Sequence, residues 1–166
     1  MTNWDYPFIS LLEDIVAAWQ AGVSMDGVLS RFVVETDARA SGCWRLEEGC
    51  LRLIGFGWAS DMPAEVSQGF QDATRRVPLD QTGLGIVKAA LGVRPVVGHR
   101  DPGSTGLEGS ASWIAKFQAN SSLAVPIREP KRGTILGVFA VSTASAIIEG
   151  DRLWNVMLRV SEELGR

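Results

Sequence analysis

Two nearly continuous apolar runs close to the C-terminus limit the possible folds of this chain most strongly. Residues 121–127 read Ser-Ser-Leu-Ala-Val-Pro-Ile, and residues 133–141 read Gly-Thr-Ile-Leu-Gly-Val-Phe-Ala-Val. A polar, turn-forming stretch at 129–133 separates them, so the pattern predicts an antiparallel hairpin. Because both strands are apolar at consecutive positions, both of their faces must be covered. We therefore expect this hairpin at the centre of a sheet.

The rest of the chain alternates between helical and strand periodicity, which indicates an α+β class. A strand at 94–98 contains a proline, which favours an edge position in the sheet. A first hairpin is expected from strands at 42–46 and 51–56. Helices are expected at about 7–20, 24–33, 63–76, 85–92, around 113–117, and at 153–164.

Strand parity assigns the side chains of the first hairpin to two faces. By the period of two, one face carries Trp44, Leu46, Leu51 and Leu53, and the other carries Cys43, Arg45, Arg52, Ile54, Phe56 and Trp58. The two cysteines, Cys43 and Cys50, are then over about 10 Å apart, too far for a disulfide. We expect both thiols to be reduced and to serve in packing.

The hairpin at 121–141 closely resembles the last hairpin of GAF domains. Three further matches follow in the same order as in that family: residues 46–53, the segment from Gly83-x-Gly85 to 92–97, and the closing helix after Asp151. The resemblance implies a GAF/PAS-like central antiparallel sheet of five to six strands, with terminal helices on one face and pocket helices on the other. It also implies one domain over 1–166, with an N-terminal helical segment at 1–23 and a core at about 24–164.

GAF domains hold their ligands between the sheet and the middle helices, and this resemblance implies the site residues here. Apolar walls with a few polar groups suit a small molecule, but the same aromatic side chains can simply form core. The polar trio in this set allows two interpretations, an arginine that holds an anion or an Asp101 side chain that stabilises a turn. Haem ligation by the histidine is not expected. The residues are Phe56, Trp58, Phe70, His99, Arg100, Asp101, Trp113, Ile114 and Phe117.

The resemblance implies a sensory or regulatory domain that binds a small molecule non-covalently and signals through its terminal helices and a homodimer interface. A ligand-free dimerisation or protein-interaction module is the alternative. For the dimer, we expect a seam on the final helix that includes Leu164. A separate signalling output protein is a possible partner.

The signatures of specialised GAF subtypes are missing from the sequence. There is no Asn-Lys dipeptide of the cyclic-nucleotide type, and both cysteines fall in the first hairpin rather than near the pocket helices. This placement argues against a covalent bilin and against a free methionine sulfoxide reductase. We accordingly expect no enzymatic activity, no cofactor and no metal site. The pair Gly83-x-Gly85 is expected to serve close packing rather than to bind phosphate.

Composition restricts the partners and the compartment. Of 166 residues, 46% are hydrophobic and the formal net charge is −3, with basic residues scattered along the chain. This pattern is not that of a nucleic-acid-binding protein, and no apolar run approaches the length of a membrane span. The start of the chain, 1–5, lacks the features of a signal peptide, so a cytoplasmic protein is expected. The chain is either free-standing, as Met1 suggests, or part of a larger signalling protein.

Overall fold

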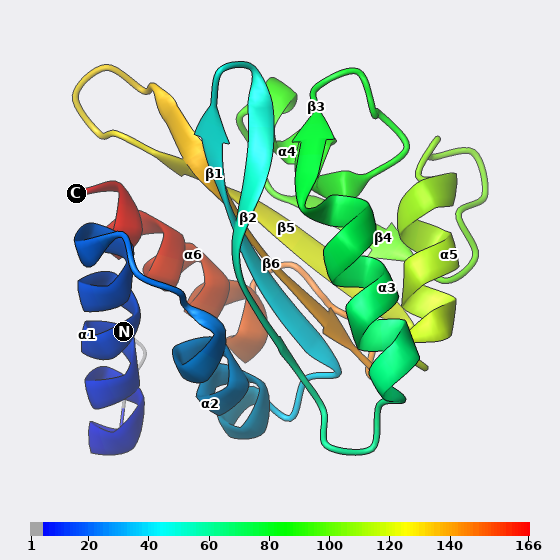
Figure 1. Cartoon of the computed structure of the whole chain (residues 1–166), viewed down its shortest axis with the longest axis horizontal. Helices are drawn as coiled ribbons and strands as arrows, with labels where there is room; N and C mark the ends of the chain where they lie inside the picture. The colour runs from blue at the N-terminus through cyan, green and yellow to red at the C-terminus, as the bar shows by residue number, and fades with distance from the viewer. Residues whose placement is uncertain (1–4) are drawn as a thin grey trace.

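A computed structural model describes residues 5–166 as one antiparallel sheet between two layers of helices (Figure 1). The segment 1–4, on which the signal-peptide argument partly rests, lies outside the described residues. The helices are α1 (Tyr6–Ala21), α2 (Asp26–Thr36), α3 (Ala64–Thr74), α4 (Gly85–Gly92), α5 (Glu108–Lys116) and α6 (Arg152–Gly165). The strands are β1 (Ala40–Glu47), β2 (Cys50–Trp58), β3 (Arg76–Pro78), β4 (Val96–His99), β5 (Ser121–Arg128) and β6 (Ile135–Thr143).

The sheet order is β3-β2-β1-β6-β5-β4, which confirms the expected α+β architecture. The β5–β6 hairpin lies at the centre, with β6 paired to both β1 and β5. β4 lies at one edge, as its proline predicts. The other edge strand, β3, is three residues long and carries too short a pattern to be recognised in the sequence.

Each face of the sheet has its own hydrophobic core. We call the side covered by α1, α2 and α6 the terminal-helix face. Its core includes Phe32, Phe139 and Met157, each fully buried. We call the side covered by α3, α4 and α5 the pocket-helix face, and its core includes Trp44 and Phe56. The predicted separation of terminal and pocket helices is confirmed.

Two glycines of β2 allow α2 to lie directly against the sheet. A Cβ added at Gly57 would stand 2.5 Å from the carbonyl carbon of Leu29, and one added at Gly55 would stand 2.5 Å from the Cβ of Met25. The helix is also joined to the strand through the Asp26 carboxylate, which accepts a hydrogen bond of 2.8 Å from the backbone N–H of Phe56. The terminal-helix face is therefore closed at this point by backbone contact.

A β-bulge in β2 changes which face its later residues occupy. Cys43 pairs with Gly55 while Trp44 pairs with Leu53, so Ile54 is an extra residue in the ladder. The predicted assignment of Phe56 and Trp58 to the Cys43 face is therefore wrong. The bulge moves Phe56 to the pocket-helix core beside Trp44, and Trp58 lies on the same face, stacked on Phe56. Strand parity cannot reveal an inserted residue.

The bulge also sets the separation of the two cysteines. Cys43 pairs with Gly55, five positions beyond Cys50, which at about 3.3 Å per residue is roughly 16 Å along the strand. Both cysteines are free, as predicted. Cys43 is fully buried, and this burial raises the pKa of its thiol far above the usual range.

Candidate functional site

A cavity of about 60 Å³ lies between the sheet and the pocket helices. It adjoins a second cavity of about 30 Å³ closer to β1 and β2, and several residues line both. A single water needs only about 10–15 Å³ on this measure, so the two cavities hold several small atoms. The first is lined by Trp44, Phe70, Thr74, Leu84, Gly85, Ile86, Ser110, Trp113, Ile114, Phe117, Ser122, Leu123, Ala124, Ala140, Val141 and Ser142.

Small side chains on the two central strands leave this space unfilled. Ser122 pairs with Ser142, and Ala124 pairs with Ala140 two residues further along. Because the side-chain period of a strand is two, these four residues share one face. The bulky residues between them, such as Leu123, belong to the core of the opposite face. The alternation of large and small side chains therefore fills the terminal-helix face and hollows the pocket-helix face.

Aromatic rings from β1, β2, α3 and the end of α5 form the rest of the lining. Phe70 of α3 is central to this cluster, with its ring centroid 5.0 Å from Phe56, 5.1 Å from Trp113 and 5.0 Å from Phe117. Trp44 contacts the same ring edge-on at 6.1 Å. Most of these rings have edge-to-face or tilted geometries, which add to the energy of their burial. The wall is a continuous aromatic surface rather than isolated side chains.

The polar groups in the first cavity are uncharged. Ser110 lies in the first turn of α5, and its Oγ accepts a hydrogen bond of 2.7 Å from the N–H of Gly85. Within residues 5–166, the hydroxyls of Ser122 and Ser142 have no protein hydrogen-bond partner. No Asp, Glu, Lys, Arg or His lines this cavity. The site can therefore offer hydroxyl groups to a ligand but no opposite charge.

Five of the nine predicted pocket residues line the two cavities. These are Phe56, Phe70, Trp113, Ile114 and Phe117. Trp58 stacks on Phe56 at 5.8 Å but is 39% exposed and lines neither cavity.

The polar trio that follows β4 lies away from the cavities. His99, Arg100 and Asp101 are exposed and line neither of them. Asp101 accepts a hydrogen bond of 3.1 Å from the N–H of Gly103, which matches the turn interpretation. Its place at the end of a strand does not bring this trio to the pocket, because the strand is at the edge of the sheet.

The glycine pair Gly83-x-Gly85 joins α4 to α5. Gly83 accepts a 3.0 Å hydrogen bond from the N–H of Ser110, while the N–H of Gly85 donates to the hydroxyl of the same serine. The Gly85 N–H is therefore engaged within the protein. This supports the expected packing role.

Sequence reasoning missed the serines of the cavity. Ser122 and Ser142 lie within the two strands that were recognised, but they were not singled out as binding groups. A usable signal was present, since small residues recur with a period of two in 122–124 and 140–142. Recognising it required the knowledge that these positions face helices rather than solvent.

An arginine connects the two helix layers at the end of the cavity. Arg39, which precedes β1, donates from Nε to the carbonyl oxygen of Phe117 at 2.9 Å and from a terminal nitrogen to Asp61 at 2.6 Å. Its side chain is only 14% exposed. The hydrogen bond from Arg39 lowers the pKa of the Asp61 carboxyl. The end of α5 is thus tied to the segment that follows α2.

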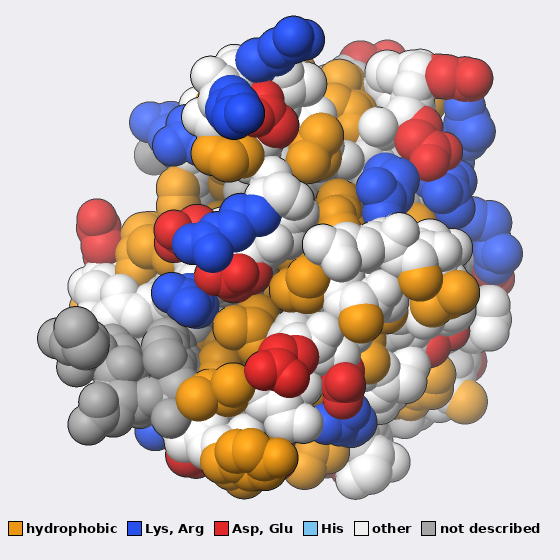
Figure 2. Space-filling view, turned by 90° about the vertical axis from the view of Figure 1, so that its left-hand side faces the viewer, with side chains coloured by type: hydrophobic (Ala, Val, Ile, Leu, Met, Phe, Trp, Pro, Cys, Tyr) orange, Lys and Arg blue, Asp and Glu red, His pale blue; other side chains and the backbone are white. Residues whose placement is uncertain are grey.

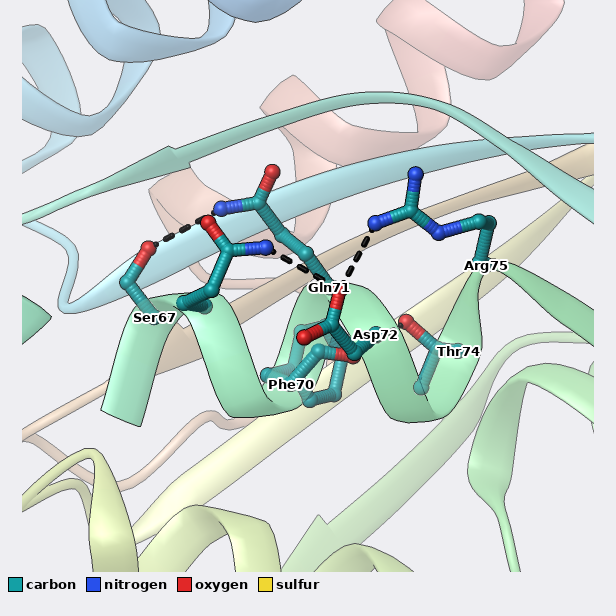
Figure 3. A network of polar contacts seen from close by, with 7 residues as sticks. Ser67, Phe70, Gln71, Asp72, Thr74 and Arg75 are labelled. Atoms are coloured by element: carbon teal, nitrogen blue, oxygen red, sulfur yellow. Dashed lines mark hydrogen bonds and ion pairs between the residues drawn. The ribbon is translucent and has the colours of Figure 1, made fainter. Parts of the chain in front are cut away.

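A network of polar contacts runs along α3 (Figure 3). Gln71 donates to the hydroxyl of Ser67 at 3.1 Å, and Arg75 donates to Asp72 at 2.7 Å. The pKa of the Asp72 carboxyl is lowered, first by this hydrogen bond from Arg75 and then by one from Gln68. These contacts satisfy the polar side of the helix and leave Phe70 for the aromatic cluster.

Comparison with solved structures shows that the chain has the GAF fold. The A. aeolicus nlh2 GAF domain in an inactive state is 13% identical, with a TM-score of 0.65 over 95% of this chain and 93% of that one. The GAF domain of the Acinetobacter phosphoenolpyruvate-protein phosphotransferase is 16% identical, with a TM-score of 0.58 over 99% and 92%. No family model and no curated protein matches the sequence.

The same comparison corrects the prediction that the chain is not an enzyme. The type II free methionine-R-sulfoxide reductase from Thermoplasma acidophilum is 17% identical, with a TM-score of 0.59 over 93% of this chain and 92% of that one. An enzyme therefore shares this architecture, and excluding enzymatic activity was wrong. The physical reason is that chemistry is set by the side chains of a site and not by the fold that carries it.

Two general features can be checked across the described part of the chain. None of the helices within residues 5–166 is long and apolar enough to cross a lipid bilayer. The same residues contain no cluster of three or more His, Cys, Asp or Glu side chains able to hold a metal ion.

Proposed function

We propose that this chain is a GAF-type sensory or regulatory domain that binds a small, uncharged molecule in the cavity beneath α3, α4 and α5. The observation that carries the proposal is the pair of serine hydroxyls, Ser122 and Ser142, without protein partners in an otherwise apolar cavity. These hydroxyls can therefore hydrogen-bond to a molecule that enters the cavity. A ligand with a hydrogen-bonding group and an apolar body would suit such a lining.

The dimensions of the cavity restrict the ligand. Drug-sized ligands occupy pockets of about 300–1,000 Å³, whereas this cavity measures about 60 Å³. A ligand of a few heavy atoms fits as the structure stands, and a larger one requires α5 to move outward. Trp113 is the side chain that would move with it, since it lines the cavity while remaining half-buried.

Signalling would follow from differential affinity for two arrangements of the helices. A ligand shifts an equilibrium only by the difference in its affinity for the two states. Moving α5 would strain the hydrogen bond between Arg39 and Phe117, which ties α5 to the end of the α2 segment. The terminal helices would receive the signal through this connection.

Native mass spectrometry of the purified protein tests the sensor proposal. We expect an additional non-covalent mass per subunit that disappears on denaturation, and we expect Ala140→Val to abolish it because its methyl groups enter the cavity. Ala17→Val, on the exposed side of α1, is the matched control. A bound mass that survives Ala140→Val would contradict the cavity as the binding site.

The alternative is a ligand-free interaction module, which the small size of the cavity favours. In that case Ala140→Val would fill an unused space, and it would raise the melting temperature without changing any bound species. Bare subunits in both the wild type and the variant, together with this stabilisation, would support the alternative and contradict the sensor.

We further propose that the protein forms a homodimer through its terminal helices. The sequence predicts that Leu164 lies in the dimer seam. A substitution there cannot test the dimer, because Leu164 is 2% exposed and belongs to the core. The most exposed large apolar side chains on α1 and α2 are Tyr6 at 82% and Val34 at 78%, followed by Ile9 at 41%. Figure 2 shows that hydrophobic and charged side chains are interspersed on the α1 side of the molecule.

The dimer proposal predicts a change of mass with little change of stability. Val34→Glu should shift the sedimentation coefficient from dimer to monomer, whereas exposed substitutions usually alter stability by less than about 0.5 kcal/mol. Ile148→Glu is the control, since Ile148 is 66% exposed in the loop before α6. An unchanged sedimentation profile for Val34→Glu would contradict this interface.

A further inference from the structure

We propose that the outer edge of β4 is a docking site for an extended acidic segment of a partner protein, which would add to the sheet as a further strand. The site is separate from the cavity and does not depend on its ligand. Its two components are an open sheet edge and a groove of one charge sign beside it.

The edge has backbone groups directed away from the sheet. The N–H of Arg100 donates to the carbonyl oxygen of Asn120 at 3.0 Å, in continuation of the pairing between β4 and β5. Alternate residues of an antiparallel strand direct their groups to the same side, so Gly98 also faces β5. Val97 and His99 therefore direct their N–H and C=O groups outward, where no strand of the described chain pairs with them.

A groove of about 580 Å³ runs along this edge. Its walls come from α4, from β4 and from the loop that connects β4 to α5. Leu91 lines the groove and is 54% exposed, and Val93 beside it is 40% exposed. These apolar side chains can contact alternate side chains of an added strand. The lining residues are Thr82, Lys88, Leu91, Gly92, Arg94, Pro95, Val96, Val97, Thr105 and Leu107.

The charge of the groove selects an acidic occupant. Residues 81–100 contain three Lys or Arg and no Asp or Glu, although the whole chain has a net charge of −3. Lys88 and Arg94 line the groove, and neither forms an ion pair within residues 5–166. Lys88 donates one hydrogen bond to the carbonyl oxygen of Thr105. Cationic side chains without ion-pair partners attract carboxylates and repel basic segments.

A strand added to an exposed edge gains affinity from the main chain and specificity from the side chains. Here the main-chain partners would be Val97 and His99, and the charge partners would be Lys88 and Arg94. A free anion would contact only Lys88 and Arg94. Strand addition and simple anion binding can therefore be distinguished by whether the main chain of the ligand takes part.

The test uses a capped hexapeptide of alternating glutamate and valine, with lysine–valine and backbone N-methylated versions as controls. We expect the acidic peptide to shift the amide resonances of Val97 and His99 and to slow their hydrogen exchange. Arg94→Glu should weaken this binding at least tenfold at low salt. The lysine–valine and N-methylated peptides should not bind.

A matched pair of variants isolates the backbone contribution. His99→Pro removes an outward N–H without removing a hydrogen bond to β5, while His99→Ala removes only the side chain. We expect at least a tenfold loss of affinity for the first and little change for the second. Unchanged spectra for the remaining sheet would show that both variants fold.

Four results would overturn the proposal. Equal binding of the N-methylated peptide, or equal displacement by acetate, would reduce the site to an anion contact. Absence of binding at millimolar peptide would mean that the basic residues only shield the edge from association. A dimer of the wild type that His99→Pro dissociates would assign this edge to a second copy of the chain.

Discussion

The two faces of the sheet are formed by the same strands but are packed differently. On the terminal-helix face, Phe32 and Phe139 meet edge-on at 5.2 Å with both side chains fully buried, and Gly57 brings the backbone of α2 into contact with β2. On the pocket-helix face, serines and alanines in β5 and β6 leave a cavity beneath an aromatic wall. One face is therefore packed throughout, while the other combines its own hydrophobic core with a space that its side chains leave unfilled.

Truncation in the fully packed face should have the largest effect. Phe139→Ala removes a buried ring and leaves a void between β6 and α2, so we expect the free energy of unfolding to fall by about 3–5 kcal/mol. Urea denaturation followed by circular dichroism measures this change. A loss below about 1 kcal/mol would mean that the terminal helices can collapse onto the gap, and the contrast between the faces would be weaker than the structure indicates.

Replacing a glycine by alanine should lower the stability of the protein on the terminal-helix face and raise it on the pocket-helix face. Gly57→Ala places a methyl group against the backbone of α2, and overpacking of this kind costs about 1–3 kcal/mol. Gly69→Ala adds a Cβ 3.8 Å from the ring of Trp113 within α3, where alanine is favoured over glycine by roughly 0.5–1 kcal/mol. The melting temperatures of the two variants measure both changes. A Gly57→Ala protein as stable as the wild type would contradict the backbone contact between α2 and β2.

The contact between Arg39 and Asp61 should make the stability of the protein depend slightly on pH. The hydrogen bond from Arg39 lowers the pKa of Asp61 in the folded state, so this carboxylate stabilises the fold at neutral pH. The contribution is present above the unfolded pKa of about 4 and is lost as the pH falls through the lower folded value. Asp61→Asn should therefore have a flatter stability profile than the wild type below about pH 4.

A carbon-detected NMR titration of Asp61 and urea midpoints at several pH values provide the measurements for this connection. The effect is expected to be small because the Asp61 side chain is 69% exposed. Asp80→Asn is the matched control, since the carboxylate of Asp80 forms no ion pair within the described residues. Identical profiles for the wild type and Asp61→Asn would remove the proposed role of this pair.

Much of the architecture could be predicted from local patterns. The apolar run at 121–141 indicated a central hairpin, Pro95 indicated the edge position of β4, and Gly22 marked the end of the first helix, where it adopts a left-handed conformation with φ of 69°. Each of these signals is contained in a few neighbouring residues. Periodicity and backbone restrictions act over that same range, so the sequence is sufficient for them.

The candidate site was only partly predictable, because its geometry depends on contacts between distant segments. Phe70 and Trp113 line the cavity from the helices, whereas Phe56 reaches it only through a bulge at Ile54 that parity does not reveal. The GAF resemblance implied that His99 lines the pocket, but His99 follows an edge strand and lines neither cavity.

The sequence by itself determined which segments become helices, which become strands apart from the three-residue β3, and which hairpin lies at the centre of the sheet. Only the tertiary structure decided that Ser122 and Ser142 face a cavity, that Leu164 is core rather than surface, and that β4 has an open edge beside a basic groove. The physical reason is the distance along the chain over which each feature is encoded. Periodicity is encoded within a turn or a strand, whereas a cavity, a buried seam and an open edge exist only after separate elements have packed against one another.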